Sequence, residues 1–133
     1  MASGLQKIMD TYATALKAGD VETLVSLFGP KGAFMREEMG AAVGPEALRA
    51  TYKELFAALE LDLQFAVHDA EEVGDVGWWR GVSQGSVKIL KSGAVEPHGF
   101  NLLVVFRKEG GETWKIRAFL YAYNRPESGH TPT

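Results

Sequence analysis

Two histidines stand in this sequence where a folded chain could use them for proton transfer. His98 alternates with Phe100 and Leu102, so the apolar face of a strand would carry its imidazole. A histidine beside an apolar row can act as a general acid or base near neutral pH. His68 belongs to another alternating segment, on the polar side. For both residues the alternative is a hydrogen-bonded histidine of the core or its rim.

A third candidate is Arg36, which is followed by Glu37 and Glu38. An inward-facing arginine could bind a carboxylate or enolate oxygen, or stabilise a developing oxyanion. The alternative is a solvated strand residue that pairs with one of the two glutamates.

Other kinds of chemistry are excluded or disfavoured by composition. The chain has no cysteine, which excludes a thiolate nucleophile, a disulfide scaffold and an iron–sulfur site. Its three histidines are scattered and no calcium-loop spacing occurs, so we expect no metal and no cofactor. The 14 basic and 17 acidic residues give a net charge of −3 without a basic block, so we expect no nucleic-acid partner.

The 133 residues are predicted to form one domain over 1–126, followed by a flexible tail over 127–133. The amino terminus lacks the pattern of a signal peptide, and no apolar run reaches the ~18 residues of a membrane helix. We therefore expect a cytoplasmic protein that does not contact a membrane.

Apolar residues repeat at helical spacing in three early segments, which predicts helices over 5–17, 21–28 and 45–59. Asp20 would cap the second helix, and Gly29-Pro30 would end it. Pro45 would open the third helix.

From Leu61 the period changes to two, which predicts strands. A short strand near 33–37 is followed by strands over 61–68, 76–90, 95–108 and 113–124. The acidic stretch 69–75 is interpreted as a solvated turn, and the last three strands pair antiparallel because their connections are short. Each helix has one apolar stripe, which must be buried against one face of this sheet, so the fold class is α+β. If the sheet is curved, it would enclose an apolar cavity between itself and the helices.

Several segments together resemble the NTF2-like superfamily. They are, in order, YATALKAGD over 12–20, LVSLF over 24–28, GPEALRATY over 44–52, LVVF over 103–106 and GGETWKI over 110–116. The resemblance spans about residues 5–125, and it points to the SnoaL-like, ketosteroid-isomerase-like (DUF4440-type) branch. It implies a cystatin-like cone, with three N-terminal helices on a strongly curved, mainly antiparallel sheet, commonly dimeric.

The resemblance also suggests site residues. Tyr12 aligns with the tyrosine that donates a hydrogen bond to an enolate oxygen in steroid isomerases, and Tyr52 aligns with a second pocket tyrosine. The aspartate base is replaced by Arg36, which cannot accept a proton, although a slip of one residue would bring Glu37 inward. The second donor aligns near Leu102, beside Asn101, so ordinary ketosteroid isomerisation is not expected.

The sequence thus predicts a cofactor-independent enzyme that isomerises, cyclises or dehydrates a hydrophobic, oxygen-bearing small molecule by proton transfer. The catalytic candidates are Tyr12, Arg36, His98, His68 and Glu37, and the substrate-binding candidates are Tyr52, Phe56, Trp78, Phe100, Asn101 and Leu102. Adjacent Trp78 and Trp79 would point to opposite faces of a strand, and an exposed indole there could anchor a homodimer. The alternative function is a non-catalytic ligand-binding or dimerisation module of the same fold.

Overall fold

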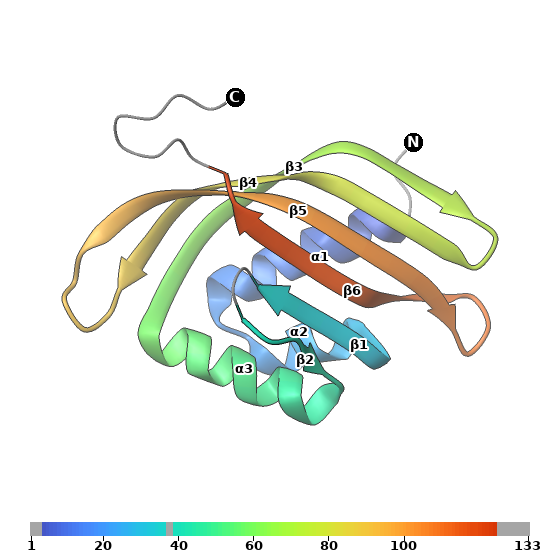
Figure 1. The fold of residues 1–133 in the computed structure, drawn as a ribbon, viewed down its shortest axis with the longest axis horizontal. Helices are drawn as coiled ribbons and strands as arrows, with labels where there is room; N and C mark the ends of the chain where they lie inside the picture. The colour runs from blue at the N-terminus through green and yellow to red at the C-terminus, as the bar shows by residue number, and fades with distance from the viewer. Residues whose placement is uncertain (1–3, 37–38, 125–133) are drawn as a thin grey trace.

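The computed structural model describes residues 4–36 and 39–124 and shows an α+β fold in two layers (Figure 1). The helices are α1 (Gly4–Ala18), α2 (Val21–Ser26) and α3 (Pro45–Ala58). The Asp20 side chain accepts a hydrogen bond from the Thr23 backbone N–H at 3.2 Å and so caps α2, as predicted. Pro45 opens α3, where a missing N–H costs nothing.

Six strands form a single sheet in the order β2-β1-β6-β5-β4-β3. Their bounds are β1 (Phe28–Arg36), β2 (Ala42–Val43), β3 (Leu59–Val73), β4 (Val76–Ile89), β5 (Val95–Glu109) and β6 (Thr113–Tyr123). All neighbours pair antiparallel except β1 and β6, which run parallel. The long strands β3 to β6 bend over α1, and all three helices lie on the concave side (Figure 1).

Two sequence predictions were wrong at element boundaries. The second helix ends at Ser26, and Phe28 already begins β1, where the Ile116 N–H donates to the Leu27 carbonyl at 2.8 Å. Residues 69–72 are not a solvated turn but part of β3, because each pairs with a residue of β4. The turn itself is only Gly74-Asp75, with Gly74 at a φ of 64° that suits a tight hairpin.

The core lies between the helices and the concave face of the sheet. Trp79 is fully buried there, and its indole N–H donates to Gln6 Oε1 of α1 at 2.9 Å. Trp78 lies on the other face and is half-buried, so the two indoles do point to opposite faces. Within the described residues, no helix has the length and apolar character needed to cross a membrane.

Candidate functional site

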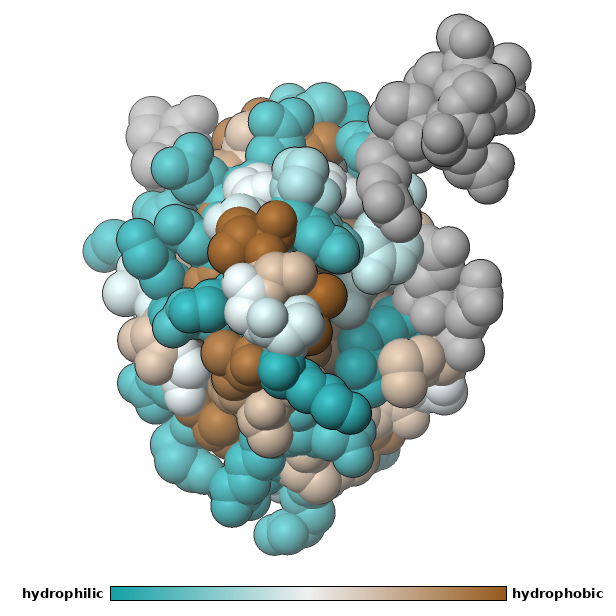
Figure 2. Space-filling view, turned by 90° about the vertical axis from the view of Figure 1, so that its left-hand side faces the viewer, coloured by the Kyte–Doolittle hydropathy of each residue, from teal (hydrophilic) through white to brown (hydrophobic). Residues whose placement is uncertain are grey.

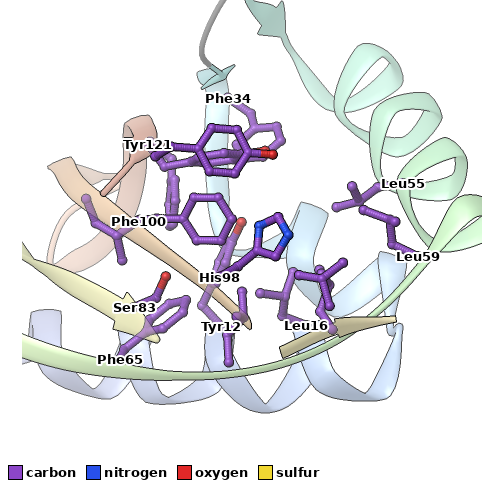
Figure 3. Close-up of a pocket in the computed structure, with 16 residues that line it drawn as sticks. Tyr12, Leu16, Phe34, Leu55, Leu59, Phe65, Ser83, His98, Phe100 and Tyr121 are labelled. Carbon is purple, nitrogen blue, oxygen red and sulfur yellow. The ribbon is translucent and has the colours of Figure 1, made fainter. Parts of the chain in front are cut away.

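A cavity of about 80 Å³ lies between the concave face of the sheet and the helices (Figure 3). Its wall is largely aliphatic and aromatic: Leu16, Leu55, Leu59, Leu61, Leu63, Val87, Leu102, Phe34, Phe65, Phe100 and Phe119. The remaining lining residues bring polar atoms to this apolar wall: Tyr12, Ser83, His98, Tyr121 and Tyr123. Among the described residues that line the cavity there is no Lys, Arg, Asp or Glu.

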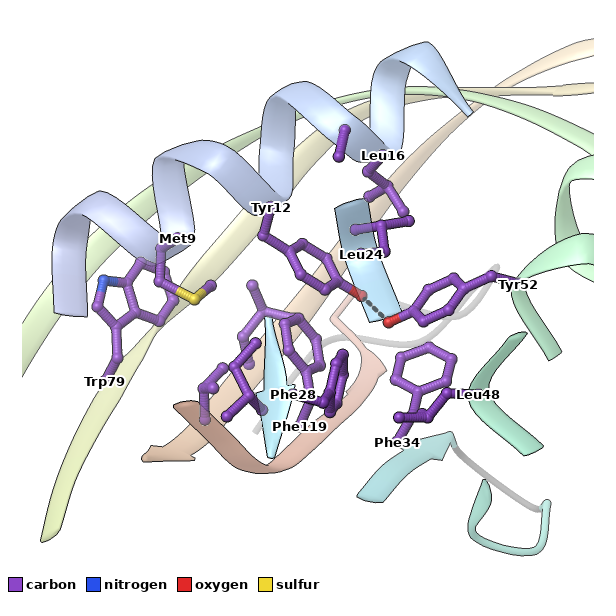
Figure 4. Close-up of a cluster of buried hydrophobic side chains, with 14 of the residues drawn as sticks. Met9, Tyr12, Leu16, Leu24, Phe28, Phe34, Leu48, Tyr52, Trp79 and Phe119 are labelled. Carbon is purple, nitrogen blue, oxygen red and sulfur yellow. Dashed lines mark hydrogen bonds between the residues drawn. The ribbon is translucent and has the colours of Figure 1, made fainter. Parts of the chain in front are cut away.

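On the helix side of the cavity, the hydroxyls of Tyr12 and Tyr52 lie 2.5 Å apart (Figure 4). Tyr12 comes from the apolar stripe of α1 and stacks on Phe119 at 4.5 Å between ring centroids. Tyr52 comes from α3 and is fully buried. Burial is the main cause that raises the pKa of both phenols far above the usual value, so both stay neutral.

The direction of this hydrogen bond decides what the pair can offer a ligand. Tyr52 has no other hydrogen-bond partner among the described residues and does not line the cavity, whereas Tyr12 does line it. If Tyr12 donated, the Tyr52 proton would be enclosed without an acceptor, which is costly. We therefore infer that Tyr52 donates to Tyr12, which leaves the Tyr12 proton free to donate into the cavity.

On the sheet side, His98 brings a ring nitrogen to the cavity. Its side chain is only 12% exposed and packs against Phe100 and Tyr123, with ring centroids 5.7 and 5.5 Å away. Nε2 lies 3.4 Å from Glu96 Oε1, and Nδ1 is buried without a hydrogen-bond partner in the described part of the chain. A carboxylate accepts only, so a neutral His98 carries its proton on Nε2 and presents the Nδ1 lone pair.

Ser83 of β4 also brings a polar atom to the cavity. It is 1% exposed, and its Oγ has no hydrogen-bond partner within residues 4–36 and 39–124. Sequence reasoning missed both Ser83 and Glu96. The alternation of β4 through Trp79 and Val87 places Ser83 on the inward face, and Glu96 is two residues from His98, so the strand period was the available signal.

The sequence also matches a family model, the SnoaL-like domain, over residues 9–118. The chain belongs to the SnoaL-like family. No curated protein matches it significantly.

Solved structures confirm the NTF2-like fold of this SnoaL-like protein. A ketosteroid isomerase-like protein from Erwinia carotovora atroseptica superposes with a TM-score of 0.86 at 20% identity, over 91% of this chain and 94% of that one. A candidate dehydratase of the NTF2-like family from Streptomyces avermitilis gives 0.75 at 16%, over 92% and 95%. An NTF2-like protein with a cystatin-like fold from Novosphingobium aromaticivorans gives 0.71 at 18%, over 96% and 84%.

Of the predicted site residues, four line the cavity: Tyr12, His98, Phe100 and Leu102. Arg36 does not line it. Its guanidinium lies 5.7 Å from the ring centroid of Phe34, and Arg36 pairs with the lining residue Tyr121, so it stands on the inward face of β1 beside the lining residues. Glu37 lies outside the described residues.

The other predicted residues lie elsewhere. His68 and Asn101 border a groove on the convex face of the sheet, because alternation points them away from the inward residues next to them. Trp78 lies on that convex face for the same reason, since its neighbour Trp79 points inward. Tyr52 packs deeper in the core, and Phe56 borders a surface groove beside α3.

Among the described residues, no group of three or more His, Asp or Glu side chains could hold a metal ion. The cavity lining itself provides a neutral O–H donor at Tyr12, a nitrogen lone pair at His98 and a hydroxyl at Ser83. An apolar wall strengthens the electrostatic effect of each group on a bound molecule.

Proposed function

We propose that this SnoaL-like protein is a cofactor-independent enzyme that moves a proton on a hydrophobic, oxygen-bearing small molecule. The reaction class is isomerisation, cyclisation or dehydration. The observation that carries the proposal is the unpartnered Nδ1 of His98, buried in the same apolar cavity as the Tyr12 hydroxyl. A proton acceptor and a neutral hydrogen-bond donor on one small cavity are what enolisation of a carbonyl compound requires.

In this mechanism Tyr12 donates a hydrogen bond to the carbonyl oxygen of the substrate. That bond stabilises the negative charge that develops on the oxygen when His98 Nδ1 removes a proton from the adjacent carbon. Glu96, 3.4 Å from Nε2, stabilises the imidazolium that forms and holds the ring in place. Tyr52 holds the Tyr12 hydroxyl in position. The proton then returns from His98 to another atom of the substrate.

In the proposed mechanism Arg36 acts as a positive charge at a distance from the substrate. Its guanidinium packs over Phe34, and its positive charge favours the ionised form of Tyr52 against the larger effect of burial, which raises the pKa of that phenol. A cation beside the lining residues would stabilise negative charge on the substrate oxygen without touching it.

The size of the cavity indicates how a hydrophobic substrate would lie. About 80 Å³ is roughly half of a cavity that holds benzene, so only the reacting end fits inside. A surface groove of about 190 Å³ adjoins the cavity, and both are lined by Leu16, Leu59 and Leu61. Figure 2 shows this end of the molecule, where apolar residues gather near the β4–β5 hairpin and the α3–β3 junction. The apolar remainder of the substrate would lie in this groove.

Substitution of His98 and Tyr12 tests the proposal once a ligand that co-purifies with the protein is identified by mass spectrometry. His98→Gln should lower turnover at least about 100-fold, because general-base catalysis contributes about that much. Tyr12→Phe should lower it at least about 10-fold, or about 1.4 kcal/mol in the barrier. His68→Gln on the convex face is the matched control and should leave turnover unchanged. An unchanged rate for His98→Gln would refute the proposed mechanism.

A non-catalytic ligand-binding module is the second candidate, and the small volume of the cavity favours it. Enclosed ligand sites commonly measure about 300–1,000 Å³, several times the volume here. Under this alternative the co-purified ligand is recovered chemically unchanged after incubation with the protein, and His98→Gln alters affinity only.

We also propose that a second copy of this chain packs on the convex face of the sheet. That face carries Leu103 and Leu120, 42% and 40% exposed, beside a groove of about 420 Å³. Its rim holds an acid and a base, Asp69 and Arg80, paired at 2.7 Å. A rim with both charges can be self-complementary across a two-fold axis. Light scattering should give twice the chain mass for the wild type and a monomer for Leu120→Lys, and a wild-type monomer would refute the dimer.

A further inference from the structure

Ser83 is a polar residue of the cavity that neither the proposed proton transfer nor the packing of the core uses. Its Oγ is buried, and the described residues provide it with no hydrogen-bond partner. A buried hydroxyl without a partner lowers the stability of a protein. Alanine would fill almost the same volume without that cost, so the packing of Ser83 between Phe65 and Phe100 on the neighbouring strands does not explain the hydroxyl.

The sheet register places Ser83 diagonally across from His98. Ser83 pairs with Phe100, and His98, two residues earlier on β5, pairs with Gly85. Both side chains therefore point into the cavity from adjacent strands, one diagonal step apart (Figure 3). The partner of His98 across the strands, Gly85, has no side chain, and a Cβ there would collide with the backbone oxygen of Asp62.

The charges of the cavity restrict what can occupy this space. Among the described residues that line the cavity there is no Lys or Arg, and Arg36 packs over the ring of Phe34 without lining the cavity. A carboxylate placed there would be buried without a countercharge, which is strongly unfavourable. A hydrocarbon would leave the hydroxyl of Ser83 unpartnered. The arrangement therefore favours an uncharged, oxygen-bearing group.

We propose that Ser83 binds a second oxygen atom of the ligand, so that the reacting end of the ligand is a compact, uncharged hydroxy-carbonyl group. One oxygen accepts from Tyr12, and the other exchanges a hydrogen bond with Ser83. This inference rests on the proposed function only in placing the ligand in this cavity. It goes further because it names Ser83 as a specificity-determining residue and excludes carboxylates.

Binding of three small probes tests the inference without any turnover. The probes are 4-hydroxybutan-2-one, butan-2-one without the hydroxyl, and the 3-hydroxybutanoate anion, each titrated into the ¹⁵N-labelled protein and followed by NMR. The hydroxy ketone should bind about five-fold more tightly than butan-2-one, the typical value of one net hydrogen bond. The anion should bind more weakly than both. Equal affinity of the anion and the hydroxy ketone would overturn the inference.

Ser83→Ala should remove the preference for the hydroxy ketone and leave the affinity for butan-2-one unchanged. Ser86→Ala is the matched control, because Ser86 lies on the opposite face of the same strand and should keep the preference. The unfolding temperature of Ser83→Ala should equal or exceed that of the wild type. A lower unfolding temperature, or a preference that survives in Ser83→Ala, would overturn the inference, because the hydroxyl would then serve the fold.

These outcomes are separable from those of the proposed function. If His98→Gln retains full turnover while Ser83→Ala loses the probe preference, the mechanism fails and the ligand class stands. If His98→Gln abolishes turnover and Ser83→Ala binds every probe as the wild type does, the mechanism stands and the assignment of Ser83 fails.

Discussion

The polar atoms on the two sides of the cavity differ in whether they have hydrogen-bond partners. On the helix side, the Tyr12 and Tyr52 hydroxyls are hydrogen-bonded to each other at 2.5 Å, and Tyr12 stacks on Phe119. On the sheet side, Ser83 Oγ and His98 Nδ1 are buried with no partner in the described chain. The polar atoms of the helix side therefore satisfy each other, whereas the described chain leaves those of the sheet side without a partner.

The strongest test of this contrast is alkaline pH. Burial raises the pKa of both tyrosines in the folded protein, so above pH ~10 the unfolded chain loses protons that the folded chain keeps. Their contribution is fully present below that pH, and stability falls as pH rises beyond it, by up to about 1.4 kcal/mol per pH unit for each tyrosine. Urea unfolding between pH 9 and 11 should show this fall, and the double variant Tyr12→Phe/Tyr52→Phe should flatten it. An equal slope in both proteins would contradict the assignment.

A double-mutant cycle on the tyrosine pair has the next largest expected effect. Tyr12→Phe leaves the Tyr52 hydroxyl enclosed without a partner and should cost about 1–3 kcal/mol of unfolding free energy. Tyr52→Phe should cost less, because the Tyr12 hydroxyl still reaches the cavity. The double variant should cost less than the sum, with a coupling near 1 kcal/mol. Additive costs measured by urea unfolding would show that the hydroxyls do not depend on each other.

The smallest expected effect lies at Glu96. Its side chain is 54% exposed and 3.4 Å from His98, so Glu96→Gln should change the unfolding free energy by less than about 0.5 kcal/mol. A glutamine oxygen still accepts from Nε2 but carries no charge, so turnover should fall less than about 10-fold, against about 100-fold for His98→Gln. Equal losses in steady-state assays of the two variants would mean that Glu96 does more than hold and stabilise the imidazole.

Local patterns predicted most of the fold. The helical stripe of α1, the cap at Asp20 and the alternation of β4 and β5 depend on neighbours a few residues away, and each is present as expected. The parallel pairing of β1 with β6 was not predicted, because residues near 34 and 119 are far apart in the chain. The end of β3 was mispredicted for a similar reason, because its acidic residues form a strand by pairing their backbone with β4.

The candidate site was predictable only in part. Tyr12 and His98 were found because the resemblance or the apolar alternation pointed to them, and both line the cavity. Whether Arg36 lines the cavity could not be predicted, because this depends on how its long side chain packs, here over the ring of Phe34. Nothing in the sequence marked Ser83 as a site residue except its position on the inward face of the alternating strand β4.

The amino-acid sequence by itself determined the fold class, the family and the direction in which most residues of β4 and β5 point, because these depend on residue type and on a period of two or 3.6. The tertiary structure alone decided which polar atoms find partners. Tyr12 meets Tyr52 across 40 residues of chain, and Ser83 meets no acceptor or donor in the described residues. Partnering depends on the packing of segments distant in sequence, and no local pattern records it.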